Sequence, residues 1–79
     1  MTNAPHAYPT ERERVAANVR AEAARRGISQ AALAQLLNIN QAGISRRMSG
    51  KIDFSAPELS AIAAQFGVPV GTFFGEVAA

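Results

Sequence analysis

The chain has 79 residues, with 8 basic and 6 acidic side chains, a formal net charge of +2 at pH 7 and no cysteine. A chain of this length forms one domain with a small core, and without cysteine it has neither a disulfide framework nor a thiolate metal site. No apolar run approaches the ~20 residues of a membrane span, and the N-terminus lacks the regions of a signal peptide. We therefore expect a soluble, cytoplasmic protein.

The first segment, residues 1–9, carries Pro5 and Pro9 among small polar residues, and we interpret it as a flexible N-terminal arm. His6 lies alone in this arm, where we expect a solvated imidazole without a function. Residues 10–79 then form the single folded domain.

The first helix is predicted from a capping box, in which Thr10 is followed by Glu13. The helix is expected to run from Glu11 to Arg26 and to stop at Gly27. Its inward positions recur at helical spacing and are Val15, Ala16, Val19 and Ala23.

Two shorter helices are expected between Ser29 and Lys51, on either side of a hinge at residues 38–40. Ser29 can cap the first of them and Asn40 the second, which starts at Gln41 and stops at Gly50. The inward positions of the first are Leu33, Ala34 and Leu37.

A second capping box, Ser55 with Glu58, starts a fourth helix that ends at Gly67, and residues 70–74 are expected to add one short helical turn. The inner stripe of the fourth helix is Leu59, Ile62, Ala63 and Phe66. Since no strand pattern is present, the predicted fold is all-α, a compact bundle of about five short helices.

Charge is distributed unevenly along the chain, because no acidic side chain occurs between Glu22 and Asp53. The cations in this window are Arg25, Arg26, Arg46, Arg47 and Lys51. Folding is expected to concentrate positive charge on one part of the surface, as a protein that neutralises phosphates requires.

The two helices within residues 29–51 have the layout of a helix-turn-helix, which places its second helix in the DNA major groove. At ~100° per residue, Ile44 and Met48 of that helix point inward, and Arg47 lies on the flank. The outward residues predicted to read bases are Gln41, Ala42, Ser45 and Arg46. An amide can pair with adenine, a guanidinium with guanine, and a methyl group can touch thymine.

Backbone contacts to DNA set register and affinity without reading sequence. The residues predicted to bind phosphates are Ser29, Gln30, Asn40, Arg47, Ser49 and Lys51. Gly43 has no side chain, and we expect it to allow a close approach of the helix to DNA or to the preceding helix.

Residues 28–51 resemble the helix-turn-helix of the Cro and lambda-repressor superfamily, also called the xenobiotic-response-element family, and the similarity extends to Phe74. The matching segments are Ser29-Gln30, Leu33-Ala34, residues 40–44, residues 49–51, Glu58-Leu59, Ile62-Ala63 and residues 66–68. Asn38 stands where the family often has glycine, although asparagine tolerates the left-handed conformation. Arg47 stands where many members have an apolar residue.

The resemblance implies a transcriptional regulator, commonly a phage or prophage repressor or an antitoxin module, that binds operators as a dimer. It implies that Gln30 contacts a phosphate and can brace Gln41, which reads adenine. Positions matching Ala42, Ser45 and Arg46 are implied to face bases.

A homodimer on a palindromic operator is expected because one small module makes few contacts with DNA. The candidate dimer contacts are Phe73, Phe74 and Val77. The alternative is that Phe73 and Phe74 close the bottom of the core. Leu36 either fills a local groove or belongs to a contact surface.

We expect no enzyme, no metal, no cofactor and no small-molecule ligand, because cysteine is absent and His6 and Asp53 are the only residues of their types. The predicted function is a sequence-specific double-stranded DNA-binding regulator of the Cro-like or minimal phage repressor type, acting at the bacterial nucleoid. The alternatives are an antitoxin or recombination accessory protein that binds DNA, and a module that binds a partner repressor or toxin.

Overall fold

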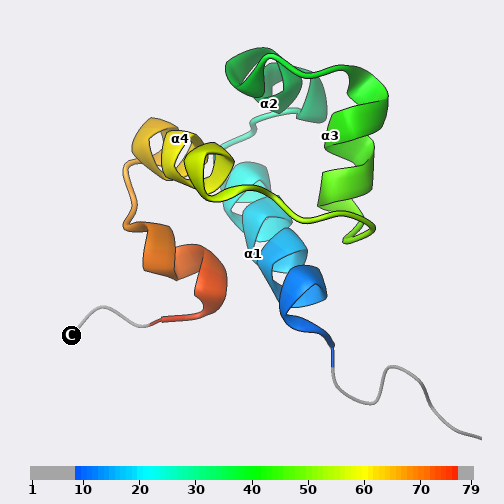
Figure 1. The fold of residues 1–79 in the computed structure, drawn as a ribbon. Helices are drawn as coiled ribbons and strands as arrows, with labels where there is room; N and C mark the ends of the chain where they lie inside the picture. Colours follow the sequence, from blue (N-terminus) through cyan, green and yellow to red (C-terminus); the bar gives the residue numbers. More distant parts are fainter. Residues whose placement is uncertain (1–8, 77–79) are drawn as a thin grey trace, which may run out of the picture.

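The computed structural model describes residues 9–76. In this range it contains four α-helices and one 3₁₀-helix and no strand (Figure 1). The elements are α1 (Glu11–Arg25), α2 (Gln30–Leu37), α3 (Gln41–Met48), α4 (Ala56–Phe66) and η1 (Val70–Phe74). The all-α prediction is confirmed. The expectations for residues 1–8, which hold most of the proposed arm, and for Val77 lie outside the described residues.

The helix starts follow from the predicted caps. Thr10 and Glu13 form a reciprocal capping box at α1, and Ser55 and Glu58 form another at α4. In each box the hydroxyl and the carboxylate accept backbone N–H groups that the first helical turn leaves without partners. α1 ends one residue earlier than expected, because Arg26 is its C-cap.

The turn between α2 and α3 depends on Asn38, which has the left-handed angles φ 56° and ψ 46°. Among the described residues it is the one non-glycine with positive φ. In this conformation the backbone N–H of Ile39 donates to the carbonyl of Ala34 at 3.0 Å and closes the end of α2. The expectation that Asn38 adopts the left-handed conformation at this turn is confirmed.

The core lies where α1, α2, α3, α4 and η1 converge. Every predicted inward residue is buried except Leu37, which is partly buried against the core. The largest of the side chains that are less than 2% exposed are Val19, Leu33, Ile44, Ile62 and Phe73. Since all five elements contribute buried side chains, the helices are stable only together.

The C-terminal element η1 packs along α1, and Asn18 of α1 donates a hydrogen bond to the carbonyl of Phe73 at 2.9 Å. Phe73 is completely buried and meets the ring of Phe66 edge-on, with 6.2 Å between the ring centroids. The prediction of Phe73 as a dimer contact is therefore wrong, because the core takes this side chain. Phe74 remains 38% exposed.

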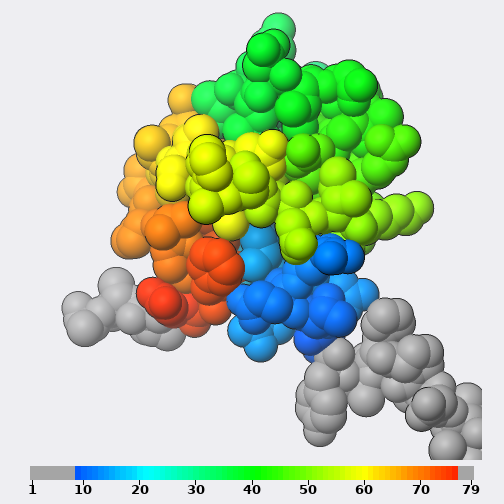
Figure 2. Space-filling model, in the orientation of Figure 1, coloured from blue at the N-terminus to red at the C-terminus, as the bar shows by residue number. Residues whose placement is uncertain are grey.

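The bundle places the helix-turn-helix and the C-terminal element on different sides. Figure 1 shows α2 and α3 at the top and right, while η1 lies at the lower left beside the C-terminus. In Figure 2 green atoms of the helix-turn-helix form the upper right of the visible surface. Within residues 9–76, no helix has both the length and the apolar character needed to cross a membrane.

Candidate nucleic-acid interface

The helix-turn-helix consists of α2, the turn at residues 38–40 and α3. The two helices pack against each other, and α3 is anchored below by Ile44 and Met48, which are 0% and 5% exposed. Asn40 caps α3, since its Oδ1 accepts the backbone N–H of Gly43 at 2.7 Å. The inner side of α3 is thus fixed in the core, and its opposite side faces solvent.

All four predicted base-reading residues, Gln41, Ala42, Ser45 and Arg46, are exposed on α3. Within the described residues no hydrogen bond or ion pair of the protein engages the side chain of Gln41 or Arg46, so both are available to a partner. An exposed α-helix of this kind fits the major groove, which admits one helix.

The predicted phosphate contacts at the helix starts also lie at the surface. Ser29 and Gln30 begin α2, and Asn40 begins α3; all three are exposed. Helix N-termini bind anions through free N–H groups and the helix dipole. In the described part of the chain no hydrogen bond joins Gln30 to Gln41, so the implied bracing is absent from the DNA-free protein.

The C-terminal end of α3 carries two more of the predicted contacts. Ser49 is exposed and its hydroxyl donates to the carbonyl of Arg46 at 3.1 Å. Lys51 is exposed as well, and its backbone N–H donates to the same carbonyl at 2.9 Å. The backbone therefore holds Lys51 close to the end of α3.

The distribution of paired and unpaired cations marks this same surface. All 8 basic residues fall within the described residues. The side chains of six of them form ion pairs or hydrogen bonds with other groups of the protein. These six are Arg12, Arg14, Arg20, Arg25, Arg26 and Arg47. The two whose side chains have no partner among the described residues are Arg46 and Lys51, both at the C-terminal end of α3.

Arg25 and Arg26 share a single carboxylate on α1, so their pairing offsets only part of their positive charge. Both pair with Glu22 on α1, Arg26 at 2.7 Å, and the guanidinium of Arg26 lies 5.0 Å from the ring centroid of Phe66. The hydrogen bond from Arg26 lowers the pKa of Glu22. Helical spacing brings this carboxylate back onto the two cations that follow it.

Arg47 is also engaged within the protein. Its Nε donates to Oε1 of Glu58 on α4 at 2.9 Å, and its Nη1 donates to the carbonyl of Gly43 at 3.0 Å. Burial raises the pKa of Glu58, but the hydrogen bonds from Arg47 and Ser55 outweigh this effect and hold the pKa below its ordinary value. The Arg47 side chain, which was predicted to bind phosphate, thus forms an ion pair with Glu58 in this structure.

The space beside Gly43 is occupied by the side chains of Asn40 and Arg47 and not by residues of α2. A Cβ at this position would lie 3.1 Å from Oδ1 of Asn40 and 3.3 Å from Nη1 of Arg47. The absence of a side chain therefore preserves both the cap of α3 and the position of the Arg47 guanidinium.

Sequence reasoning missed the residues that hold the end of α3 from α1. Arg20 donates to the carbonyl of Met48, and Arg12 bonds both Asp53 and the carbonyl of Lys51. These partners are 28 to 41 positions apart in the chain, so no spacing pattern could have shown them.

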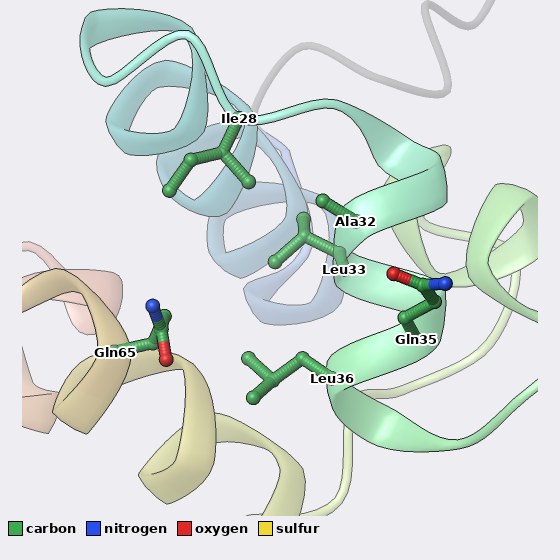
Figure 3. Close-up of a pocket in the computed structure, with 6 residues that line it drawn as sticks. All are labelled: Ile28, Ala32, Leu33, Gln35, Leu36 and Gln65. Atoms are coloured by element: carbon green, nitrogen blue, oxygen red, sulfur yellow. The ribbon is translucent and has the colours of Figure 1, made fainter.

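Leu36 lines a hollow between α2 and α4 and is 37% exposed. Figure 3 shows Leu36 of α2 and Gln65 of α4 extending toward this space from opposite sides. The hollow has a volume of about 390 Å³ and is bounded by Ile28, Ala32, Leu33, Gln35, Leu36 and Gln65. Leu36 therefore borders a groove that it does not fill.

The comparisons with known proteins agree with this geometry. The model of the helix-turn-helix family HTH_3 matches residues 19–73, more than half of the chain. The chain therefore belongs to this family of Cro/lambda-repressor-like, DNA-binding transcriptional regulators.

Among solved structures, the crystal structure of the clp gene regulator ClgR from C. glutamicum is similar, with a TM-score of 0.74 and 23% sequence identity. The match covers 90% of this chain and 97% of that chain, and at this identity it shows a shared fold. No curated protein matches the chain.

Proposed function

We propose that this protein recognises a specific double-stranded DNA sequence by inserting α3 into the major groove. The observation that carries the proposal is that Arg46 and Lys51, the two cations without an internal partner in the described chain, both flank the exposed face of α3. The other cations form ion pairs with carboxylates or hydrogen bonds to backbone carbonyls of the protein. Free positive charge is thus concentrated where a helix-turn-helix meets phosphates.

Within this proposal Gln41 and Arg46 read bases through bidentate hydrogen bonds to adenine and guanine, and Ala42 and Ser45 contact the base edges between them. Ser29, Gln30, Asn40, Ser49 and Lys51 bind the phosphate backbone and set the register of α3 in the groove. We leave Arg47 out of this group because Glu58 occupies its guanidinium.

We further propose that the protein acts as a homodimer on a palindromic operator, with half-sites about 34–36 Å apart, as the small contact area of one module favours. Occupation of such an operator would exclude polymerase, the mode of action of a Cro-like or minimal phage repressor. The protein with the similar structure, ClgR, is described as a gene regulator, and this similarity supports a role in transcription for the present protein.

The decisive experiment selects duplexes from a random pool and then measures the affinity of wild type, Arg46→Ala and Lys51→Ala for the selected and a scrambled duplex over a salt series. Arg46→Ala is expected to relax base preference at one position per half-site, at a cost of about 1–3 kcal/mol. Lys51→Ala is expected to weaken both duplexes equally and to reduce the salt slope by about 1.

Arg14→Ala is the matched control, because Arg14 is an exposed arginine of α1 paired with Glu11 at 3.2 Å. It lies two residues from Arg12, which contacts the loop after α3, and so points away from that loop. This variant should bind like wild type. A shallow salt slope and indifference to both Arg46→Ala and Lys51→Ala would contradict the proposal and favour a protein-docking module.

A further inference from the structure

The recognition helix α3 is tied to α4 by a directional link between two polar side chains. Arg47 uses its Nε on Glu58 and its Nη1 on the carbonyl of Gly43, at 2.9 and 3.0 Å. The same Oε1 of Glu58 accepts the backbone N–H of Ser55 at 2.9 Å. Both charged side chains are only 18% exposed.

This link acts where the apolar core gives little directional control. The backbone of α3 packs closely on α1 and α2, whereas α3 with α4 is not among the closely packed pairs. Burial of Ile44 and Met48 is favourable at many small rotations of α3 about its axis, because apolar contact is non-directional. Hydrogen bonds to a planar guanidinium have a preferred geometry, so the Arg47 pair opposes such rotation.

The position of Arg47 on the helix makes this effect specific. At ~100° per residue it lies about 100° from Met48 on one side and about 100° from Arg46 on the other. A rotation of α3 that breaks the link to Glu58 would therefore move Arg46 sideways in the groove. A bidentate contact with a base edge tolerates little such displacement.

We propose that Arg47 and Glu58 are positioning residues, which fix the rotation of α3 and so set the base preference of Arg46 without touching DNA. The inference rests on the proposed function and deepens it. The rival role for Arg47 is a direct phosphate contact, and the two roles give opposite expectations for Glu58. Removal of a carboxylate close to DNA strengthens binding when only charge matters, but it weakens selectivity when the carboxylate orients the helix.

The test compares Glu58→Gln, Arg47→Met and the double variant in the binding assay above. Glutamine at position 58 keeps an amide oxygen for the N–H of Ser55, but without the negative charge its hydrogen bond to the Arg47 guanidinium is weaker. Each single variant is expected to lose roughly tenfold in the ratio of selected to scrambled affinity, and the double variant is expected to lose no more than either single one. The salt slope of Arg47→Met should equal that of wild type.

Ser55→Ala is the control for stability, because it removes the hydroxyl that accepts the N–H of Glu58 and leaves the ion pair in place. Measured at a temperature where every variant is folded by circular dichroism, it should keep wild-type selectivity. Equal loss of selectivity in Ser55→Ala and Glu58→Gln would overturn the proposal, since it would reduce the pair to general stabilisation.

Two other outcomes have separate meanings. Undiminished selectivity in Glu58→Gln, together with a salt slope lower by about 1 in Arg47→Met, would assign Arg47 to a phosphate and overturn the positioning role. A wild type that does not distinguish the selected from the scrambled duplex would instead overturn the proposed function itself, and this inference with it.

Discussion

Asn38 shows how a single residue sets the angle between α2 and α3. Its φ of 56° is in the left-handed region, which costs most L-residues roughly 1–2 kcal/mol and asparagine less. The side chain is exposed, so a change at this position acts through the backbone and not through packing.

Replacement of Asn38 therefore gives a graded prediction at the residue scale. Asn38→Gly is expected to stay within about 0.5 kcal/mol of wild type in the free energy of unfolding, because glycine has free access to this conformation. Asn38→Val is expected to lower the free energy of unfolding by about 1–2 kcal/mol, since a β-branched residue is strained in the left-handed conformation. Urea unfolding measures both; equal stability of the two variants would show that the turn is not left-handed in solution.

At the scale of the element, the N-terminus of α3 combines a structural cap with a proposed contact to DNA. Oδ1 of Asn40 accepts the N–H of Gly43 at 2.7 Å, and the residue is exposed. An aspartate would keep this cap and add a negative charge that the helix dipole favours. The same charge would repel a phosphate.

Asn40→Asp should therefore separate the two roles. We expect the free energy of unfolding to stay level or to rise by about 0.3–1 kcal/mol, while the affinity for DNA falls. Thermal unfolding and duplex titration measure the two effects, and an unchanged affinity in Asn40→Asp would remove this residue from the interface.

For the whole molecule, two adjacent phenylalanines divide between the core and the surface. Phe73 is completely buried against Phe66, whereas Phe74 is 38% exposed at the end of η1, opposite the helix-turn-helix (Figure 1). Phe74 therefore remains available as a contact between two copies, while Phe73 joins the elements of one copy.

Phe73→Ala is therefore expected to affect folding stability, and Phe74→Ser is expected to affect self-association. Phe73→Ala is expected to cost roughly 3–5 kcal/mol, a large part of the ~5–15 kcal/mol that stabilises a typical domain. Phe74→Ser is expected to change the free energy of unfolding by less than about 1 kcal/mol and to weaken self-association. Urea unfolding and sedimentation equilibrium test these outcomes; unchanged association in Phe74→Ser would place the dimer contact elsewhere.

Much of this protein could be predicted without coordinates because the signals are local. A cap needs a residue and its neighbour three positions on, as in Thr10 with Glu13, and an inward stripe follows from helical spacing. The left-handed turn at Asn38 and the exposure of Gln41 and Arg46 were predictable for the same reason.

The amino-acid sequence by itself thus determined the helices, their ends, their inner faces and the helix-turn-helix family. Only the tertiary structure decided how side chains of the same type are used. Among residues 9–76 the Arg46 side chain has no partner while Arg47 pairs with Glu58, and Phe73 is buried while Phe74 is partly exposed. Such choices depend on which distant segments come within hydrogen-bond or contact distance after folding. Spacing along the chain does not encode that proximity, because packing of the whole bundle creates it.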